Sequence, residues 1–308
     1  MRLQIIVLIL FCLTTLMSCK KQNEQETGPY LIFKFKFDST QARLNNFGQP
    51  AEIQAGNAAQ CGIMNQMSAH YIELTPGALT QLGKGAVIYH APETTIGGSI
   101  AIDFDKAAKA GNDEVFYKIP IKNVPAGIYE WIRISLAYQN GDVKIRVDTT
   151  INTPQGDINF NEDLNATLAS FIGFNNYIRS FKIKNQSLSV NGNRKQGFWG
   201  FETSFSINGI SYPAKDSGQA PPGSITVVNP LFNSSPIPQG SCVVTAAFKD
   251  GKKLTINGNE ANDIIIECSF STNKSIEWKD NIPNGKWEPL KGEKLVDMGV
   301  RGLIPTIY

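Results

Sequence analysis

The sequence predicts an all-β protein, an antiparallel β-sandwich with one or two short helices and long loops. In YLIFKFKF, residues 30–37, the side chains Phe33, Phe35 and Phe37 alternate with Ile32, Lys34 and Lys36. This is the period of a half-buried strand. Similar runs recur along the chain, separated by turn dipeptides such as Asn-Gly, Pro-Gly and Asp-Gly. Helix signals are few, and this pattern favours two packed antiparallel sheets.

The later strands are predicted from runs of bulky and β-branched residues. The best helix candidate is 161–178, and 97–111 could add a helical turn near Lys106. The strand-like runs after the first one cover residues 68–74, 85–90, 114–121, 129–138, 143–150, 181–190, 198–207, 242–248, 253–256, 263–270 and 274–278.

A Pro-rich stretch interrupts these strands at residues 212–241, which hold six of the sixteen prolines. The residues after it form only a few strands, and so small a piece is marginally stable alone. We therefore expect one sandwich domain over 30–308, with a Pro-rich loop at 212–241.

The N-terminus predicts export and lipidation. Residues 1–18 form a signal peptide: Arg2 supplies a positive start, and the apolar run that follows is too short to span a bilayer. The run ends Leu-Met-Ser-Cys, which resembles the lipobox of bacterial lipoproteins and implies that Cys19 carries lipid. Residues 19–29 are polar and are expected to be a lipidated tether. The expected location is the cell envelope at the outer membrane, with the membrane as a partner through the lipid; the periplasmic and surface faces both stay open.

Composition narrows the function classes. The net charge is +2 and there is no basic stripe, so no nucleic-acid partner is expected. The sequence shows no GxSxG, Walker, HExxH or GxGxxG motif, and a non-enzymatic binding protein is predicted. Cys242 and Cys268 lie in strand-like runs and are expected to form a disulfide if those strands are neighbours, leaving Cys61 as a free thiol.

The stretch MNQMSAHYIEL, residues 64–74, offers soft metal ligands. Met64, Met67 and His70 would share one face of a helix, and thioether and imidazole groups suit Cu(I). On a strand, positions i and i+3 point to opposite sides, and the methionines would then fill core gaps. The second histidine of the chain is His90.

Three stretches are informative together; in chain order they are NQMSAHYIEL, VFYKIPIKNVPAGIYEWIRISLAYQN and LTINGNEANDIIIECSFSTNKSIEW. They resemble the MbnP-like copper-binding domains of bacterial lipoproteins. The resemblance implies a β-sandwich on a lipid anchor and copper as the bound ion, with His70 as first ligand, Met64 and Met67 next and His90 last. In the copper-binding members a tryptophan two residues from the histidine is oxidised, whereas none of the four tryptophans here lies near either histidine in sequence.

Two other patterns keep alternatives open. The aromatic run Phe198, Trp199, Phe201 and Phe205 is expected in the core, but an exposed platform would bind sugars. Residues 278–293 echo part of a calcium loop without its bidentate acid, which favours a plain turn. The alternative function is therefore a glycan-binding or accessory lipoprotein of an outer-membrane complex, with a protein or polysaccharide partner.

Overall fold

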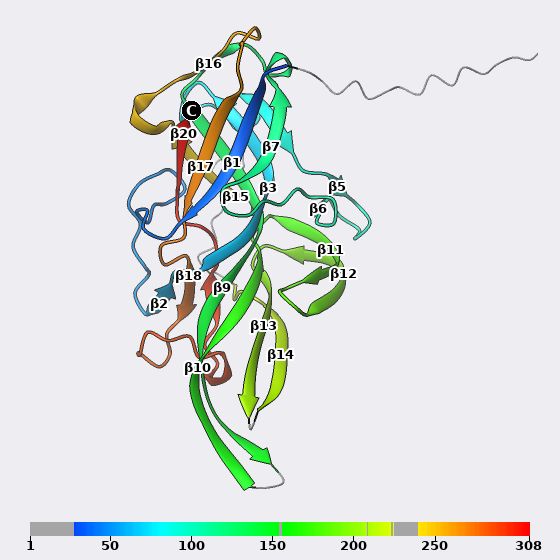
Figure 1. Cartoon of the computed structure of the whole chain (residues 1–308), viewed down its shortest axis with the longest axis vertical. Coiled ribbons are helices and arrows are strands. Elements are labelled where there is room, and N and C mark those ends of the chain that lie inside the picture. Colours follow the sequence, from blue (N-terminus) through cyan, green and yellow to red (C-terminus); the bar gives the residue numbers. More distant parts are fainter. Residues whose placement is uncertain (1–27, 154–155, 208, 223, 225–239) are drawn as a thin grey trace, which may run out of the picture.

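The computed structural model describes residues 28–153, 156–207, 209–222, 224 and 240–308 (Figure 1). Within these ranges the chain contains twenty strands, no α-helix, and the short 3₁₀ turns η1 (Ile121–Asn123), η3 (Lys249–Gly251) and η4 (Pro289–Lys291). The all-β prediction is confirmed. The predicted signal peptide, the lipidated Cys19 and most of the tether lie outside the described residues. In the part that is described, no helix is long and apolar enough to cross a membrane.

The upper half in Figure 1 is a sandwich whose first layer is a four-stranded sheet. Its central strand β1 buries Leu31, Phe33 and Phe35, as the alternation predicts. Strand β1 pairs in parallel with β17 and antiparallel with β7. In sheet order the strands are β20 (Leu303–Ile307), β17 (Ile264–Ser271), β1 (Tyr30–Asp38) and β7 (Glu114–Pro120).

The second layer belongs to a seven-stranded sheet that runs through both halves of the molecule. Strand β9 is the link, because its first part pairs with β3 and β15 while its later part pairs with β10. The strands are β3 (Ile63–Thr75), β4 (Ala86–His90), β9 (Trp131–Thr153), β10 (Gly156–Phe171), β13 (Phe198–Ile207), β14 (Ile210–Gln219) and β15 (Cys242–Ala247). The largest hydrophobic core, which includes side chains of β1, β3, β9, β15 and β17, lies between the two layers.

Smaller sheets cover the lower half of this long sheet. One packs against β9, β10 and β13 around Trp278 and Trp287, and another around Phe171 and Phe181. The first consists of β2 (Asn57–Gln60), β18 (Ile276–Lys279) and β19 (Leu295–Asp297); the second of β5 (Glu93–Thr94), β6 (Ala101–Asp103), β11 (Asn175–Lys182) and β12 (Ser187–Lys195). A further pair, β8 (Gly127–Tyr129) with β16 (Leu254–Ile256), belongs to the upper half, where Tyr129, Leu254 and Ile256 join the core of the sandwich.

The helix predicted over 161–178 is wrong, because β10 and the start of β11 occupy these residues. Leu164, Leu168 and Phe171 have helical spacing, but Leu164 and Leu168 also satisfy the strand period of two. Strand β10 is hydrogen-bonded to β9 on one side and to β13 on the other, and this pairing decides the conformation. Near Lys106 there is a single turn, in which the Ala107 amide donates to the Asp103 carbonyl at 3.0 Å.

The Pro-rich loop predicted at 212–241 begins later than expected. Residues up to Gln219 belong to β14, an edge strand, where Pro213 removes no hydrogen bond that the sheet needs. Residues 223 and 225–239 lie outside the described part.

The disulfide predicted between Cys242 and Cys268 is also wrong. Both thiols are free and buried, and Cys61 is free and exposed. Cys242 lies on β15 of the long sheet, whereas Cys268 lies on β17 of the opposite layer between β1 and β20. Their strands are not neighbours in a sheet, so the condition for the bond is not met. Burial raises the pKa of both thiols well above the ordinary value.

Candidate metal-binding site

Both histidines of the chain meet at one point, together with a glutamate. His70 lies in β3, His90 is the last residue of β4, and Glu93 begins β5. Strands β3 and β4 pair antiparallel with Tyr71 opposite His90, and the Ala91 amide donates to the His70 carbonyl at 2.7 Å. The chain then turns so that Glu93, three residues after His90, faces both imidazoles.

A β-bulge places His70. On β3, Ala69 pairs with Leu136 and Tyr71 pairs with Ser135, so His70 is an extra residue with no partner on β9. Such bulges bend a strand and re-aim a side chain, and they are common beside functional sites. The His70 side chain is only 1% exposed. The bulge therefore interrupts the alternation of β3 between the core residues Ala69 and Ile72, and the imidazole of His70 is buried facing Glu93.

The donor atoms lie close enough to share one ion. His70 Nε2 is 2.9 Å from Glu93 Oε1, and His90 Nε2 is 3.5 Å from the same oxygen. One donor atom from each of the three side chains lies within 4.8 Å of the others. The His70 ring is 5.0 Å from the His90 ring and 5.3 Å from the Phe174 ring, between centroids. His90 and Glu93 are 49% and 30% exposed, so a solute can reach the site from their side.

The electrostatics favour the forms that bind metal. Burial lowers the pKa of His90 below its ordinary 6.5, His70 lowers it further, and Glu93 opposes the shift. The hydrogen bond with His70 is the main cause that lowers the pKa of Glu93 below 4.5, against the effect of burial. At neutral pH the site therefore offers a neutral His90 imidazole and a charged carboxylate.

The other nitrogen of His70 is unusual. His70 Nδ1 is buried and has no hydrogen-bond partner among the described residues. A buried ring nitrogen without a partner is costly, and an ion bound through Nε2 would not pair it, so the case for the site rests on His70 Nε2 together with His90 and Glu93. Two imidazoles and a carboxylate are a donor set that suits Zn²⁺, Cu²⁺ or Fe²⁺.

The sequence anticipated part of this set. His70 and His90 come together, although His90 was expected last among the ligands. The methionines are placed elsewhere: Met67 is fully buried in the core of the sandwich and Met64 lies in the core of the lower half. In the described structure the group around His70 consists of His90 and Glu93. Glu93 was not predicted from the sequence. The only feature of the sequence that could have indicated it as a ligand is its position three residues after His90.

The calcium-like stretch is folded by its own hydrogen bonds. Glu293 accepts the backbone amides of Ile282 at 3.1 Å and Glu288 at 2.7 Å, and Glu288 accepts the Asn284 amide group at 2.7 Å. These carboxylates shape the turn, as the plain-turn interpretation expects.

The aromatic run is divided between core and surface. Phe198 and Phe201 are buried, whereas Trp199 and Phe205 are half-buried and line a cavity of about 410 Å³ between β9–β10 and β13–β14. Phe205 also stacks on the exposed Tyr212, with ring centroids 5.5 Å apart. The run is therefore neither wholly core nor a flat exposed platform.

The donor geometry is the evidence on which the metal site depends. It rests on three side chains from three consecutive strands and on the bulge that aims His70. Comparison with known proteins adds nothing to it: no protein-family model, curated protein sequence or solved structure matches this chain.

Proposed function

We propose that this chain is a lipid-anchored protein of the bacterial cell envelope and that its folded part is a non-enzymatic binding module for a transition-metal ion, with copper as the expected ion. The proposal rests above all on His70, His90 and Glu93, whose donor atoms lie within 4.8 Å of one another. The anchoring part rests on Cys19 and the apolar run before it.

Copper is favoured by two arguments. Divalent copper binds nitrogen and oxygen ligands more tightly than the other first-row divalent ions. The resemblance to the MbnP-like copper-binding lipoproteins also favours it. Because Met64 and Met67 are in hydrophobic cores, the local donors are nitrogen and oxygen. The form that we expect to bind is therefore Cu²⁺ rather than Cu⁺.

The three side chains have different tasks in this proposal. His70 is held by the bulge and by burial, so it supplies a fixed nitrogen. His90 and Glu93 are partly exposed and supply the side through which the ion enters. An ion at this point would take the place of the hydrogen bond between His70 Nε2 and Glu93 Oε1. Phe174 packs on the His70 ring and limits its movement.

The test is a metal titration of residues 20–308, with Cu²⁺, Cu⁺ and Zn²⁺ each competing against a chelator of known affinity. We expect one Cu²⁺ per chain, and a loss of affinity of at least about tenfold in His90→Ala and Glu93→Gln, because each removes one ligand. Glu52→Gln is the matched control, since Glu52 is an exposed glutamate away from the site. Circular dichroism checks that each variant is folded. Equal Cu²⁺ affinity in all four proteins would overturn the proposal.

A further inference from the structure

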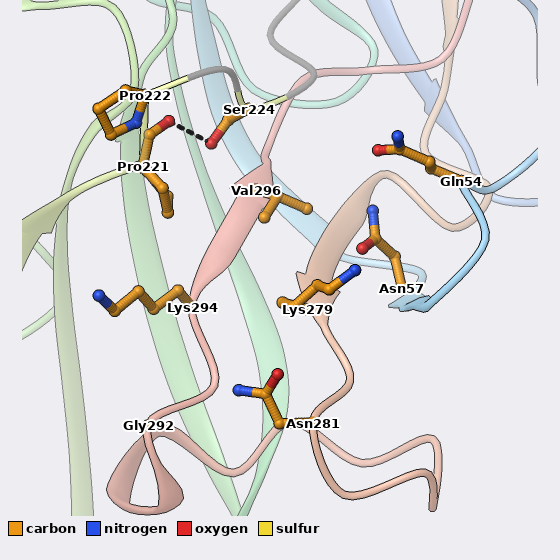
Figure 2. Close-up of a pocket in the computed structure, with 10 residues that line it drawn as sticks. All are labelled: Gln54, Asn57, Pro221, Pro222, Ser224, Lys279, Asn281, Gly292, Lys294 and Val296. Carbon is orange, nitrogen blue, oxygen red and sulfur yellow. Dashed lines mark hydrogen bonds between the residues drawn. The ribbon is translucent and has the colours of Figure 1, made fainter.

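A second, separate site lies at the end of the small sheet β2–β18–β19. A cavity of about 310 Å³ opens there (Figure 2). Its volume is at the lower end of the range for small-molecule sites. Two lysines, Lys279 at the end of β18 and Lys294 just before β19, supply its charge, and three side-chain amides supply most of its other polar groups.

The two lysines carry uncompensated charge. Neither ammonium pairs with a carboxylate in the ranges that the structure describes, and no residue lining this cavity is acidic. The neighbouring acid Asp280 accepts the Gly285 amide, and Glu293 accepts backbone amides. The strands hold the lysines side by side, because the Lys279 amide donates to the Lys294 carbonyl at 3.0 Å.

The side chains of the two lysines diverge. In Figure 2 Lys279 extends toward Asn57, whereas Lys294 extends the opposite way, toward the side of Pro221. Two separated positive charges fit a ligand with repeated negative groups better than they fit a single small anion.

The amides add the pattern that recognises hydroxyl groups. The Asn57 amide nitrogen donates to the buried Glu277 at 2.8 Å, which fixes the side chain and leaves its oxygen to accept another bond. The side-chain amides of Gln54 and Asn281 make no hydrogen bond within the described residues, so both can donate and accept. Sugar hydroxyls both donate and accept, and amides are suited to pairing with them.

A neighbouring cavity of about 510 Å³ extends the site. It shares Pro221, Pro222 and Lys294 with the first cavity and adds the half-buried Trp199. The apolar face of a sugar ring packs well on an indole ring. Two acids, Asp216 and Glu293, also line this second cavity, and Glu293 accepts the backbone amides of Ile282 and Glu288. The sugar ring on Trp199 is therefore expected to be uncharged, with the negative groups of the ligand near the ammonium groups of the two lysines.

From these observations we propose that the cavity between Lys279 and Lys294 binds an acidic oligosaccharide of the uronic-acid type, with a further sugar ring on Trp199. The site shares no residue with the metal site and does not depend on metal binding. It makes the folded part of the chain able to hold an anionic polysaccharide as well as an ion.

The experiment is calorimetric titration of residues 20–308 with a tetramer of galacturonic acid, a neutral glucose tetramer and inorganic phosphate. We expect the acidic tetramer to bind and the double variant Lys279→Gln/Lys294→Gln to lose at least about tenfold in affinity, as expected for the loss of charged hydrogen bonds. The control is Lys249→Gln/Lys252→Gln, which removes the same charge from exposed lysines in and next to η3. Trp199→Ala should weaken the tetramer but not a galacturonic acid dimer.

Four outcomes overturn the proposal. The neutral tetramer binding as tightly as the acidic one would remove the role of the lysines. Phosphate alone competing fully for the site at equal affinity would make it a simple anion site. Absence of acidic-tetramer binding, or equal loss in the control variant, would mean that the cavity does not recognise this class of sugar.

Discussion

Replacing Glu277 by glutamine should destabilise the fold more than any exposed charge substitution. Glu277 lies on β18 and its side chain is 1% exposed. Oε2 is 2.7 Å from Arg43 Nη2 and 3.6 Å from Arg301 Nη2. Oε1 accepts the Asn57 amide group at 2.8 Å and the Gln54 backbone amide at 3.3 Å. This carboxylate thus pairs with Arg43, lies near Arg301, and fixes one wall of the lysine-lined cavity through Asn57 and Gln54.

The loss of stability in Glu277→Gln depends on which ion pairs Arg43 and Arg301 retain. Removing one partner of a buried ion pair typically costs about 3–5 kcal/mol, because the remaining charge stays buried. Arg301 retains a second carboxylate, Asp297, whereas the structure shows no other ion pair for Arg43 in the described ranges. Burial already lowers the pKa of Arg43, which shows that its environment disfavours unpaired charge. Glutamine can still accept from Asn57. We therefore expect a loss of about 3 kcal/mol in the free energy of unfolding, at the lower end of that range.

Urea unfolding followed by tryptophan fluorescence measures this difference. The control is Asp163→Asn, because Asp163 is an exposed acid that pairs with Arg146 at 3.1 Å and Lys286 at 2.9 Å. Exposed pairs contribute less than about 1 kcal/mol each. If Glu277→Gln costs no more than Asp163→Asn, the reasoning from burial is refuted.

Two further predictions concern pH and thiols. The contribution of His90, measured as the difference in copper affinity between the wild-type protein and His90→Ala, should hold as the pH falls to 6.5 and shrink only below it, because burial keeps the pKa of His90 under that value. A difference that already shrinks well above pH 6.5 in a titration series would contradict this. In the folded protein without reductant, maleimide should label Cys61 alone, because Cys242 and Cys268 are buried. After unfolding, mass spectrometry should count two more labels, on Cys242 and Cys268. A single label after unfolding would instead indicate a disulfide between these two cysteines.

The strand pattern was predictable because burial in a sheet repeats every second residue. The alternation of β1 is read directly from its phenylalanines. The segment of β10 was not predictable in the same way. Leu164 and Leu168 fit the period of a helix and of a strand equally. Only the pairing of β10 with β9 and β13 selects the strand, and β13 is distant from β10 in sequence.

The candidate site shows a similar limit. The histidines and their chemistry could be singled out from the sequence, but their grouping depends on a bulge in β3 and on the pairing of β3 with β4. The bulges change which side chains of β3 face the core. The spacing of Met64, Met67 and His70 therefore predicted methionine ligands for His70, whereas the structure places both methionines in hydrophobic cores. Glu93 joins the site because of the turn after β4, which no local periodicity records.

X-ray absorption and electron paramagnetic resonance of the Cu²⁺-loaded protein test the metal site most directly. The three side chains predict a first shell containing two imidazole nitrogens and a carboxylate oxygen, with one imidazole lost in His90→Ala and no sulfur in either spectrum. A copper–sulfur contribution, or spectra that do not change in His90→Ala and Glu93→Gln, would contradict the assignment of this cluster as the metal site.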